Sequence, residues 1–140
     1  MLERTRSPLS AADGEALGYV SYFAELIDEC APENDPSEPL FRLGTSIVEA
    51  MAVGVPVEPL ARYFEFWLLR LQGVYQADPR LSDAARAFLS AARSCSPLTL
   101  GGVPISAAVM RELERVHHVQ IAMHLEKDLK STKVLREIRR

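Results

Sequence analysis

The sequence predicts an all-α fold, a compact bundle of about five to six helices. Two observations carry this prediction: apolar residues recur at steps of three and four along most of the 140 residues, and no strand-like alternation extends beyond a few positions. Hydrophobic residues make up 48% of the chain, which suffices for a buried core. We therefore expect one helical domain over residues 1–140, with residues 1–9 as a loose N-terminal segment.

Serine N-caps and proline or glycine breakers divide the chain into these helices. A serine side chain accepts from the free amides at a helix start, whereas proline removes a donor and glycine favours a stop. In chain order we expect helices from Ser10 to the proline-rich segment 32–39, from Pro39 to Gly54, from Glu58 to Gly73, after Ser82, and from Ser106 to a break at Lys130-Ser131, with a short last helix at residues 134–138.

The third expected helix is the most aromatic stretch, and it has two interpretations. In the first it is a core helix with its charges on the outer face. In the second, Phe66 lies off the stripe of the other aromatic residues, and Arg62 and Arg70 flank it. An apolar pocket rimmed by two arginines suits a peptide that is both hydrophobic and acidic, so these three residues are the candidate peptide site.

The charge of the chain is unevenly distributed. Residues 1–110 carry 8 basic and 14 acidic side chains, whereas residues 111–140 carry 8 basic and 5 acidic ones. The basic end suits an anionic partner, and it equally suits a solvated C-terminal helix whose cationic last turn complements the helix dipole.

Residues typical of a catalytic or metal site form no recognisable motif. No nucleophile elbow and no phosphate-binding glycine loop is present. His117 and His124 are two turns apart and need Glu114 or Asp128 to form a compact metal site, so we expect packed or surface histidines, no metal and no cofactor. We predict that the chain is not an enzyme; the competing hypothesis needs a pocket in which His117 or His124 meets a carboxylate.

The two cysteines and the N-terminus bear on the compartment. Cys30 and Cys95 are able to pair, but without a secretion signal we expect thiols. The N-terminal residues include no apolar stretch typical of a signal peptide, and no apolar run reaches the roughly 18–20 residues that span a bilayer. We predict a cytoplasmic protein without a membrane partner.

Three stretches carry a resemblance to a known family. The first is Tyr22-Phe23-Ala24-Glu25-Leu26, followed by Pro32-Glu33-Asn34 and Leu40-Phe41-Arg42-Leu43; the second is residues 62–75, from Arg62-Tyr63-Phe64-Glu65 to Gly73-Val74-Tyr75; the third is residues 125–135, which include Leu129-Lys130-Ser131. Their order and spacing resemble the C-terminal part of RecO, a bacterial recombination mediator in DNA repair, from about Leu17 onward.

The chain departs from the pattern of this family in two ways. The family's N-terminal OB-fold barrel, which contributes much of its DNA binding, has no counterpart in these 140 residues, so we expect either a fragment of a longer chain or the product of a gene that has lost the barrel. Many members also carry paired Cys-x-x-Cys motifs after the glycine–tyrosine motif, where this chain has residues 76–81 without cysteine. The resemblance therefore implies a helical domain without the barrel and without the zinc knuckle.

The resemblance implies a non-catalytic mediator of DNA repair and recombination, associated with the bacterial nucleoid. Its expected partners are the acidic, phenylalanine-terminated tail of single-strand-binding protein, a RecR-type protein, and single- and double-stranded DNA, the last bound weakly without the barrel. Arg62, Phe66 and Arg70 are carried over as the tail site. The residues expected to contact DNA phosphates are Lys127, Lys130, Lys133, Arg136, Arg139 and Arg140. The alternative is a generic helical dimerisation or scaffold module with no nucleic-acid role.

Overall fold

The computed structural model describes the backbone of residues 11–31 and 38–139 and the side chains of residues 14–31 and 38–126. This part of the chain contains no strand, and its elements are α1 (Ala11–Cys30), α2 (Glu38–Ala52), α3 (Val57–Leu71), α4 (Asp83–Ser94), a 3₁₀ helix η1 (Pro97–Gly102) and α5 (Ala107–Arg139). The prediction of an all-α bundle of five to six helices is confirmed.

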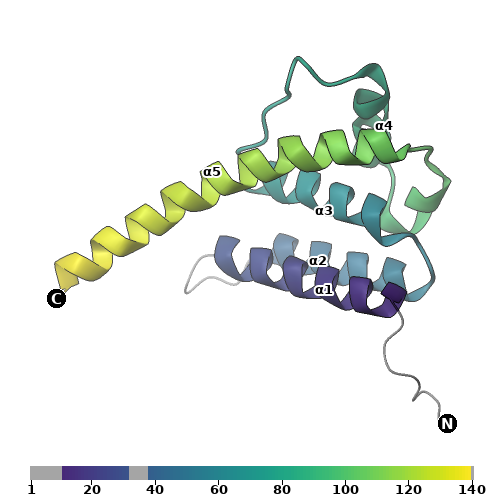
Figure 1. Ribbon diagram of the computed structural model, residues 1–140. Helices are drawn as coiled ribbons and strands as arrows, with labels where there is room; N and C mark the ends of the chain where they lie inside the picture. Colours follow the sequence, from purple (N-terminus) through teal and green to yellow (C-terminus); the bar gives the residue numbers. More distant parts are fainter. Residues whose placement is uncertain (1–10, 32–37, 140) are drawn as a thin grey trace, which may run out of the picture.

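Helix α3 is the central element of the bundle. It contacts each of the other five elements, with α1 and α2 paired beneath it and α5 crossing above it in Figure 1. Ten of its fifteen residues are buried, as expected for a helix that is contacted by all the other elements. The most aromatic stretch of the sequence is therefore the centre of the core.

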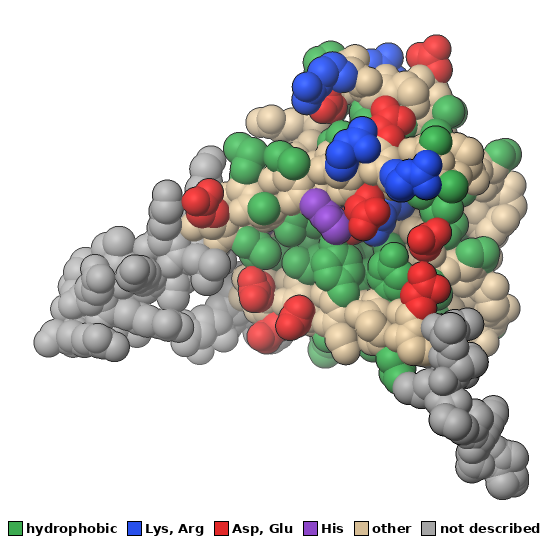
Figure 2. Space-filling model, viewed as in Figure 1, with side chains coloured by type: hydrophobic (Ala, Val, Ile, Leu, Met, Phe, Trp, Pro, Cys, Tyr) green, Lys and Arg blue, Asp and Glu red, His purple; other side chains and the backbone are tan. Residues whose placement is uncertain are grey.

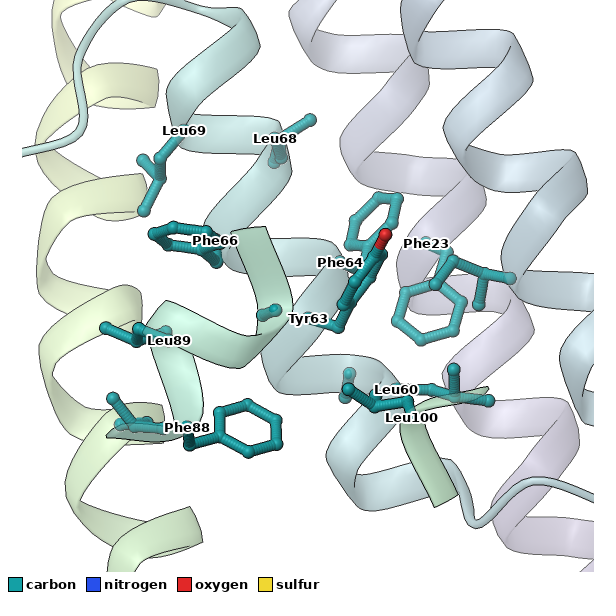
Figure 3. Close-up of a cluster of buried hydrophobic side chains, with 14 of the residues drawn as sticks. Phe23, Leu60, Tyr63, Phe64, Phe66, Leu68, Leu69, Phe88, Leu89 and Leu100 are labelled. Atoms are coloured by element: carbon teal, nitrogen blue, oxygen red, sulfur yellow. The ribbon is translucent and has the colours of Figure 1, made fainter. Parts of the chain in front are cut away.

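The core is built on the two sides of α3. Phe64 points toward α1, where its ring lies 4.6 Å from that of Phe23, measured between centroids. Phe66 and Leu69 point toward α5, and Phe88 of α4 packs below them (Figure 3). Because these rings interlock from three helices, the positions of α1, α4 and α5 all depend on the side chains of α3.

The ends of α2 and α3 follow the same local rule. Gly54 and Gly73 both have positive φ, at 97° and 73°. At each end the glycine N–H donates to the carbonyl three residues back, and the next N–H donates to the carbonyl five residues back. This double hydrogen bond is the Schellman motif, which glycine adopts without strain, so both predicted stops are confirmed.

Two of the three predicted serine caps are observed. The hydroxyl of Ser82 accepts from the N–H of Ala85, and the hydroxyl of Ser106 accepts from the N–H of Val109, both at 3.2 Å. Ser10 lies outside the described residues. Cys30 and Cys95 are not joined by a disulfide, in agreement with the expected thiols.

The expected break in the last helix is wrong. Helix α5 runs without interruption for 33 residues, to Arg139. The segment Lys130-Ser131-Thr132 contains neither proline nor glycine, so every residue keeps its backbone donor and nothing stops the helix. Despite its length, neither α5 nor any other helix of the described chain is apolar over a stretch sufficient to cross a membrane.

We expect Phe64→Ala to lower the free energy of unfolding by about 3–5 kcal/mol, because it leaves a cavity between α1 and α3. Urea denaturation followed by circular dichroism measures this loss. The matched control is Phe41→Ala, since the Phe41 side chain is 68% exposed and its removal empties no core site. An equal loss in both variants contradicts the assignment of Phe64 to the core.

Candidate functional site: a buried carboxylate joining three helices

Arg62 and Glu65 lie one turn apart on α3, and both are buried. Arg62 is 2% exposed and Glu65 is fully enclosed. The expectation that the charges of this helix lie on its outer face is therefore wrong for this pair. Because a lone buried charge is strongly disfavoured, the site depends on what surrounds the carboxylate.

The Glu65 carboxylate accepts contacts from three helices. Its Oε2 atom accepts from the Tyr22 hydroxyl on α1 at 2.6 Å and from Nη2 of Arg62 at 3.1 Å, and lies 3.1 Å from Nε2 of His118. Its Oε1 atom lies 3.1 Å from Nδ1 of His117 and 3.0 Å from Nε of Arg62. These five residues are the Glu65 cluster, in which Oε2 has three contacts and Oε1 has two, the one with Nε of Arg62 being an ion pair without a hydrogen bond.

Burial and the polar neighbours of Glu65 shift its pKa in opposite directions. Burial alone raises the pKa, but the hydrogen bonds from His117 and His118, together with the charge of Arg62, outweigh burial and lower it to about 2. The hydrogen bond between His118 and Glu65 raises the pKa of His118, because this effect is larger than the lowering of that pKa by burial. For the Tyr22 hydroxyl, burial and then the negative charge of Glu65 raise the pKa. Glu65 is therefore ionised, and Tyr22 stays protonated.

The cluster brings His117 beside a carboxylate, as the enzyme hypothesis requires, and both groups are enclosed. A carboxylate with a pKa of about 2 is a weak general base at neutral pH. His117 is fully enclosed and so is unable to touch a substrate. The Glu65 cluster forms a buried network of ion pairs and hydrogen bonds that connects α1, α3 and α5.

The open side of the cluster is a shallow hollow between α1 and α5. Its volume is about 240 Å³, and Tyr19, Tyr22, Arg62, Glu114 and His118 line it. Nη1 of Arg62 lies 3.4 Å from the Glu114 carboxylate at this edge. Figure 2 shows this face as a mixture of basic, acidic and histidine side chains over α5, above an apolar band. Glu15 lines the hollow as well, and because Arg62 is almost fully buried and paired with Glu65, the accessible charged and titratable side chains of the hollow are Glu15, Glu114 and His118.

The three histidines do not lie where the metal hypothesis needs them. His117 turns into the Glu65 cluster, and Nε2 of His124 lies 3.1 Å from the side-chain oxygen of Gln72. Glu114 faces Arg62 instead of a histidine. Within residues 14–31 and 38–126, no three His, Cys, Asp or Glu side chains are grouped as metal ligands.

The candidate peptide site has a different geometry from the one expected. Phe66 is 2% exposed and packs edge-on against Trp67 and Tyr75, so it offers no surplus surface. Arg62 belongs to the Glu65 cluster. The expected apolar pocket rimmed by both arginines is therefore not formed, and Arg70 alone of the three reaches the surface.

Arg70 lies on an aromatic platform. The carbon of its guanidinium group is 5.2 Å from the Trp67 ring centroid and 5.5 Å from that of Phe66. Its buried Nε atom has no hydrogen-bond partner. This buried atom is out of reach of a ligand, but Arg70 as a whole is half-buried, and a guanidinium held over two rings is a suitable contact for a carboxylate.

Side-chain hydrogen bonds hold the connector between α3 and α4 to α5. The backbone of Gln76 pairs with the Gln120 amide in both directions, at 3.1 and 2.8 Å. The Glu112 carboxylate accepts from both the N–H and the hydroxyl of Ser82, each at 2.7 Å. These contacts fasten both ends of the connector.

The six residues expected to contact DNA, Lys127, Lys130, Lys133, Arg136, Arg139 and Arg140, lie outside the described side chains. The backbone places the first five on the last turns of α5.

We expect Glu65→Gln to lower the free energy of unfolding at pH 7 by about 3–5 kcal/mol, because it leaves the buried Arg62 cation without its counter-charge. Urea denaturation measures the change. The matched control is Glu25→Gln on the exposed side of α1, which we expect to change stability by less than about 0.5 kcal/mol. Equal effects contradict the role of the Glu65 cluster in the fold.

The pH dependence of stability follows from the same groups. The lowered pKa of Glu65 stabilises the fold above its ordinary value of 4.5, and this is lost as the pH falls toward 2. The raised pKa of His118 stabilises the fold below its ordinary value of 6.5, and this is lost as the pH rises through the raised value. We expect greatest stability between pH 4.5 and 6.5, with the acid limb missing in Glu65→Gln, as measured by urea denaturation over a pH series. An acid limb of the same size in the variant contradicts the assignment.

Comparison with known proteins finds one family model and several named proteins that part of the chain resembles. Residues 11–77 match a family model described as "Recombination protein O C terminal". Proteins named "DNA repair protein RecO" match as well: one from Pelotomaculum thermopropionicum is 42% identical over 59 residues, and one from Koribacter versatilis is 38% identical over 58. These matches cover 42% and 41% of this chain and 23% and 22% of those relatives.

A RecO protein from an Exiguobacterium species is 30% identical over 70 residues, which are 50% of this chain and 28% of that protein. The matched stretches thus span about a quarter of the length of these relatives, and no solved structure matches the chain. The match to the family model includes α1, α2 and α3, and with them Tyr22, Arg62 and Glu65. It does not include residues 125–135. The resemblance to the C-terminal part of RecO is therefore confirmed, over residues 11–77 of this chain.

Proposed function

We propose that residues 1–140 act as one non-catalytic helical domain in recombinational DNA repair. The observation that carries this proposal is the family match over α1 to α3, together with the name shared by the matching relatives. The structure is compatible with a binding role, because the buried polar groups of the site serve the fold and leave the surface for partners. A RecR-type protein is one expected partner.

The proposed contact for the tail of single-strand-binding protein is the Arg70 platform. An acidic peptide that ends in phenylalanine offers carboxylates for the guanidinium and a ring for an aromatic surface. Trp67 is partly exposed beside Arg70, and Tyr75 completes the aromatic wall. Of the three residues that the sequence nominates, Arg70 makes the direct contact, Phe66 supports the platform, and Arg62 acts only through the fold.

The proposed DNA contacts lie on α5. Arg111 and Arg115 are exposed on its first half, and five further cations, Lys127, Lys130, Lys133, Arg136 and Arg139, follow along the same helix, while Arg140 lies outside the described residues. A row of cations on one long helix neutralises phosphates without reading sequence, so binding should be weak and strongly salt-dependent.

For the tail contact, we expect Arg70→Glu to weaken binding of a fluorescent peptide with an acidic stretch and a C-terminal phenylalanine by at least about tenfold, which equals about 1.4 kcal/mol. Fluorescence anisotropy at low salt measures the affinity. Arg93→Glu is the matched control, since Arg93 is exposed on α4, and it should bind as the parent does. No binding by the parent protein, or equal loss in both variants, overturns the tail site.

For DNA, we expect the double variant Lys130→Glu/Lys133→Glu to weaken binding to single-stranded DNA and to flatten the slope of log affinity against log salt by about two. A gel shift and an anisotropy titration between low and moderate salt measure both. The matched control replaces Arg42 and Arg93, which are exposed outside α5, with Glu. If the parent does not bind DNA at low salt, the alternative of a helical scaffold without a nucleic-acid role replaces this proposal.

A further inference from the structure

An apolar groove lies between α1 and α2, away from the Glu65 cluster. Its volume is about 500 Å³, and its lining includes Val20, Phe23, Ile27, Phe41 and Val48. Phe41 and Val48 are 68% and 47% exposed, although both are large apolar side chains. The cost of leaving such side chains in water is removed when a partner covers them.

Gly44 gives the groove its shape. A Cβ atom at this position would lie 2.7 Å from Cδ1 of Ile27, so glycine lets α1 and α2 approach closely there. Phe41 and Val48 flank Gly44 at steps of three and four residues on α2 and form the wall. The close approach makes a shallow trough with apolar walls, a shape that suits the apolar face of a helix.

The charge around the groove selects a basic occupant. Asp28 and Glu49 line it and are exposed, and its described lining includes no basic residue. Helix α1 as a whole carries five acidic and no basic residues. An acidic peptide is repelled here, so this groove is distinct from the tail site proposed at Arg70.

The chain itself contains a segment with the matching chemistry. Residues 127–140 include six basic and two acidic residues, with Leu129, Val134, Leu135 and Ile138 at helical spacings. Among the described side chains, which end at residue 126, Leu125 is the last one of α5 that packs on the core. The helix continues to Arg139, about 20 Å further, and Figure 1 shows it running out past the bundle.

We propose that the groove binds the basic C-terminal end of α5 from a second copy of the chain. The groove follows α1 from Val20 to Asp28, about 12 Å, so two to three turns of helix fill it. Because α5 is straight and leaves the bundle, its end does not return to the groove of its own chain. Reciprocal exchange of the two ends closes a two-fold dimer in which every groove is filled.

Sedimentation velocity of the full chain over a range of concentrations tests this dimer at low and high salt. We expect a reversible dimer at low salt, weakened at least about tenfold by Phe41→Asp/Val48→Asp and by high salt. Both positions are exposed, so the substitutions leave the fold intact, which circular dichroism checks. Val53→Asp is the matched control, because Val53 is 71% exposed at the end of α2 and outside the groove.

Reversing charges on the α1/α2 groove and on the basic end of α5 tests whether these two surfaces contact each other. Glu49→Lys and Lys130→Glu/Lys133→Glu should each weaken the dimer, and the combined variant should recover it. A chain that stays monomeric at low salt, a dimer that survives the groove substitutions, or a combined variant that is weaker than either parent overturns the proposal. Sedimentation without DNA and a DNA titration at protein concentrations below those at which the dimer forms measure the two associations separately, so a failure of this proposal is distinguishable from a failure of the proposed function.

Discussion

The ionised Glu65 carboxylate is the interaction on which the arrangement of the helices depends. Removing a carboxylate from water is costly, and here the cost is offset by Tyr22 from α1, Arg62 from α3, and two adjacent histidines from α5. The net gain in stability from such a cluster is modest, because desolvation opposes attraction. Its effect on geometry is stronger: a slip of α5 by one turn along α3 removes both histidines and leaves a buried charge unpaired. Apolar contacts such as Phe66 against Tyr75 tolerate small shifts, whereas the hydrogen bonds of the Glu65 carboxylate are formed in only one register of α5 relative to α3.

The features that the sequence predicts correctly are local. Gly54, Gly73, Ser82 and Ser106 mark helix ends through hydrogen bonds to residues three to five positions away, so their roles are visible without a fold. Burial of Arg62 and Glu65 is not local, because it depends on side chains 43 to 53 positions from Glu65. The available signal was a glutamate between two aromatic pairs, one turn from an arginine, in a chain with adjacent histidines.

The prediction that Phe66 has surplus exposed surface is wrong for the same reason, because its burial also depends on residues distant in the sequence. Helical periodicity places Phe66 off the main apolar stripe, but α1, α2, α4, α5 and η1 all contact α3, and residues 59–66 are buried on every face of the helix. The DNA-contact residues depend on side chains outside the described part of the chain, so for them the sequence remains the whole argument. The family match has a similar limit, because it ends at residue 77 and the Glu65 cluster needs α5. The matched segment and the rest of the chain are therefore physically interdependent: α1 to α3 alone expose Phe66 and leave Glu65 without its histidines.

The distribution of charge connects the two proposed roles of α5. Its basic end faces two competing anionic surfaces, the phosphates of DNA and the acidic rim of the α1/α2 groove of another copy. The same cations are unable to serve both at once, so a ligand that binds only the free end shifts the equilibrium toward monomer by mass action. DNA affinity then falls as protein concentration rises, and dimerisation weakens when DNA is present. Both associations weaken with salt, because both depend on screened charges. The apolar contact of Phe41 and Val48 distinguishes them, since covering those side chains contributes a part of the dimer's stability that salt does not screen.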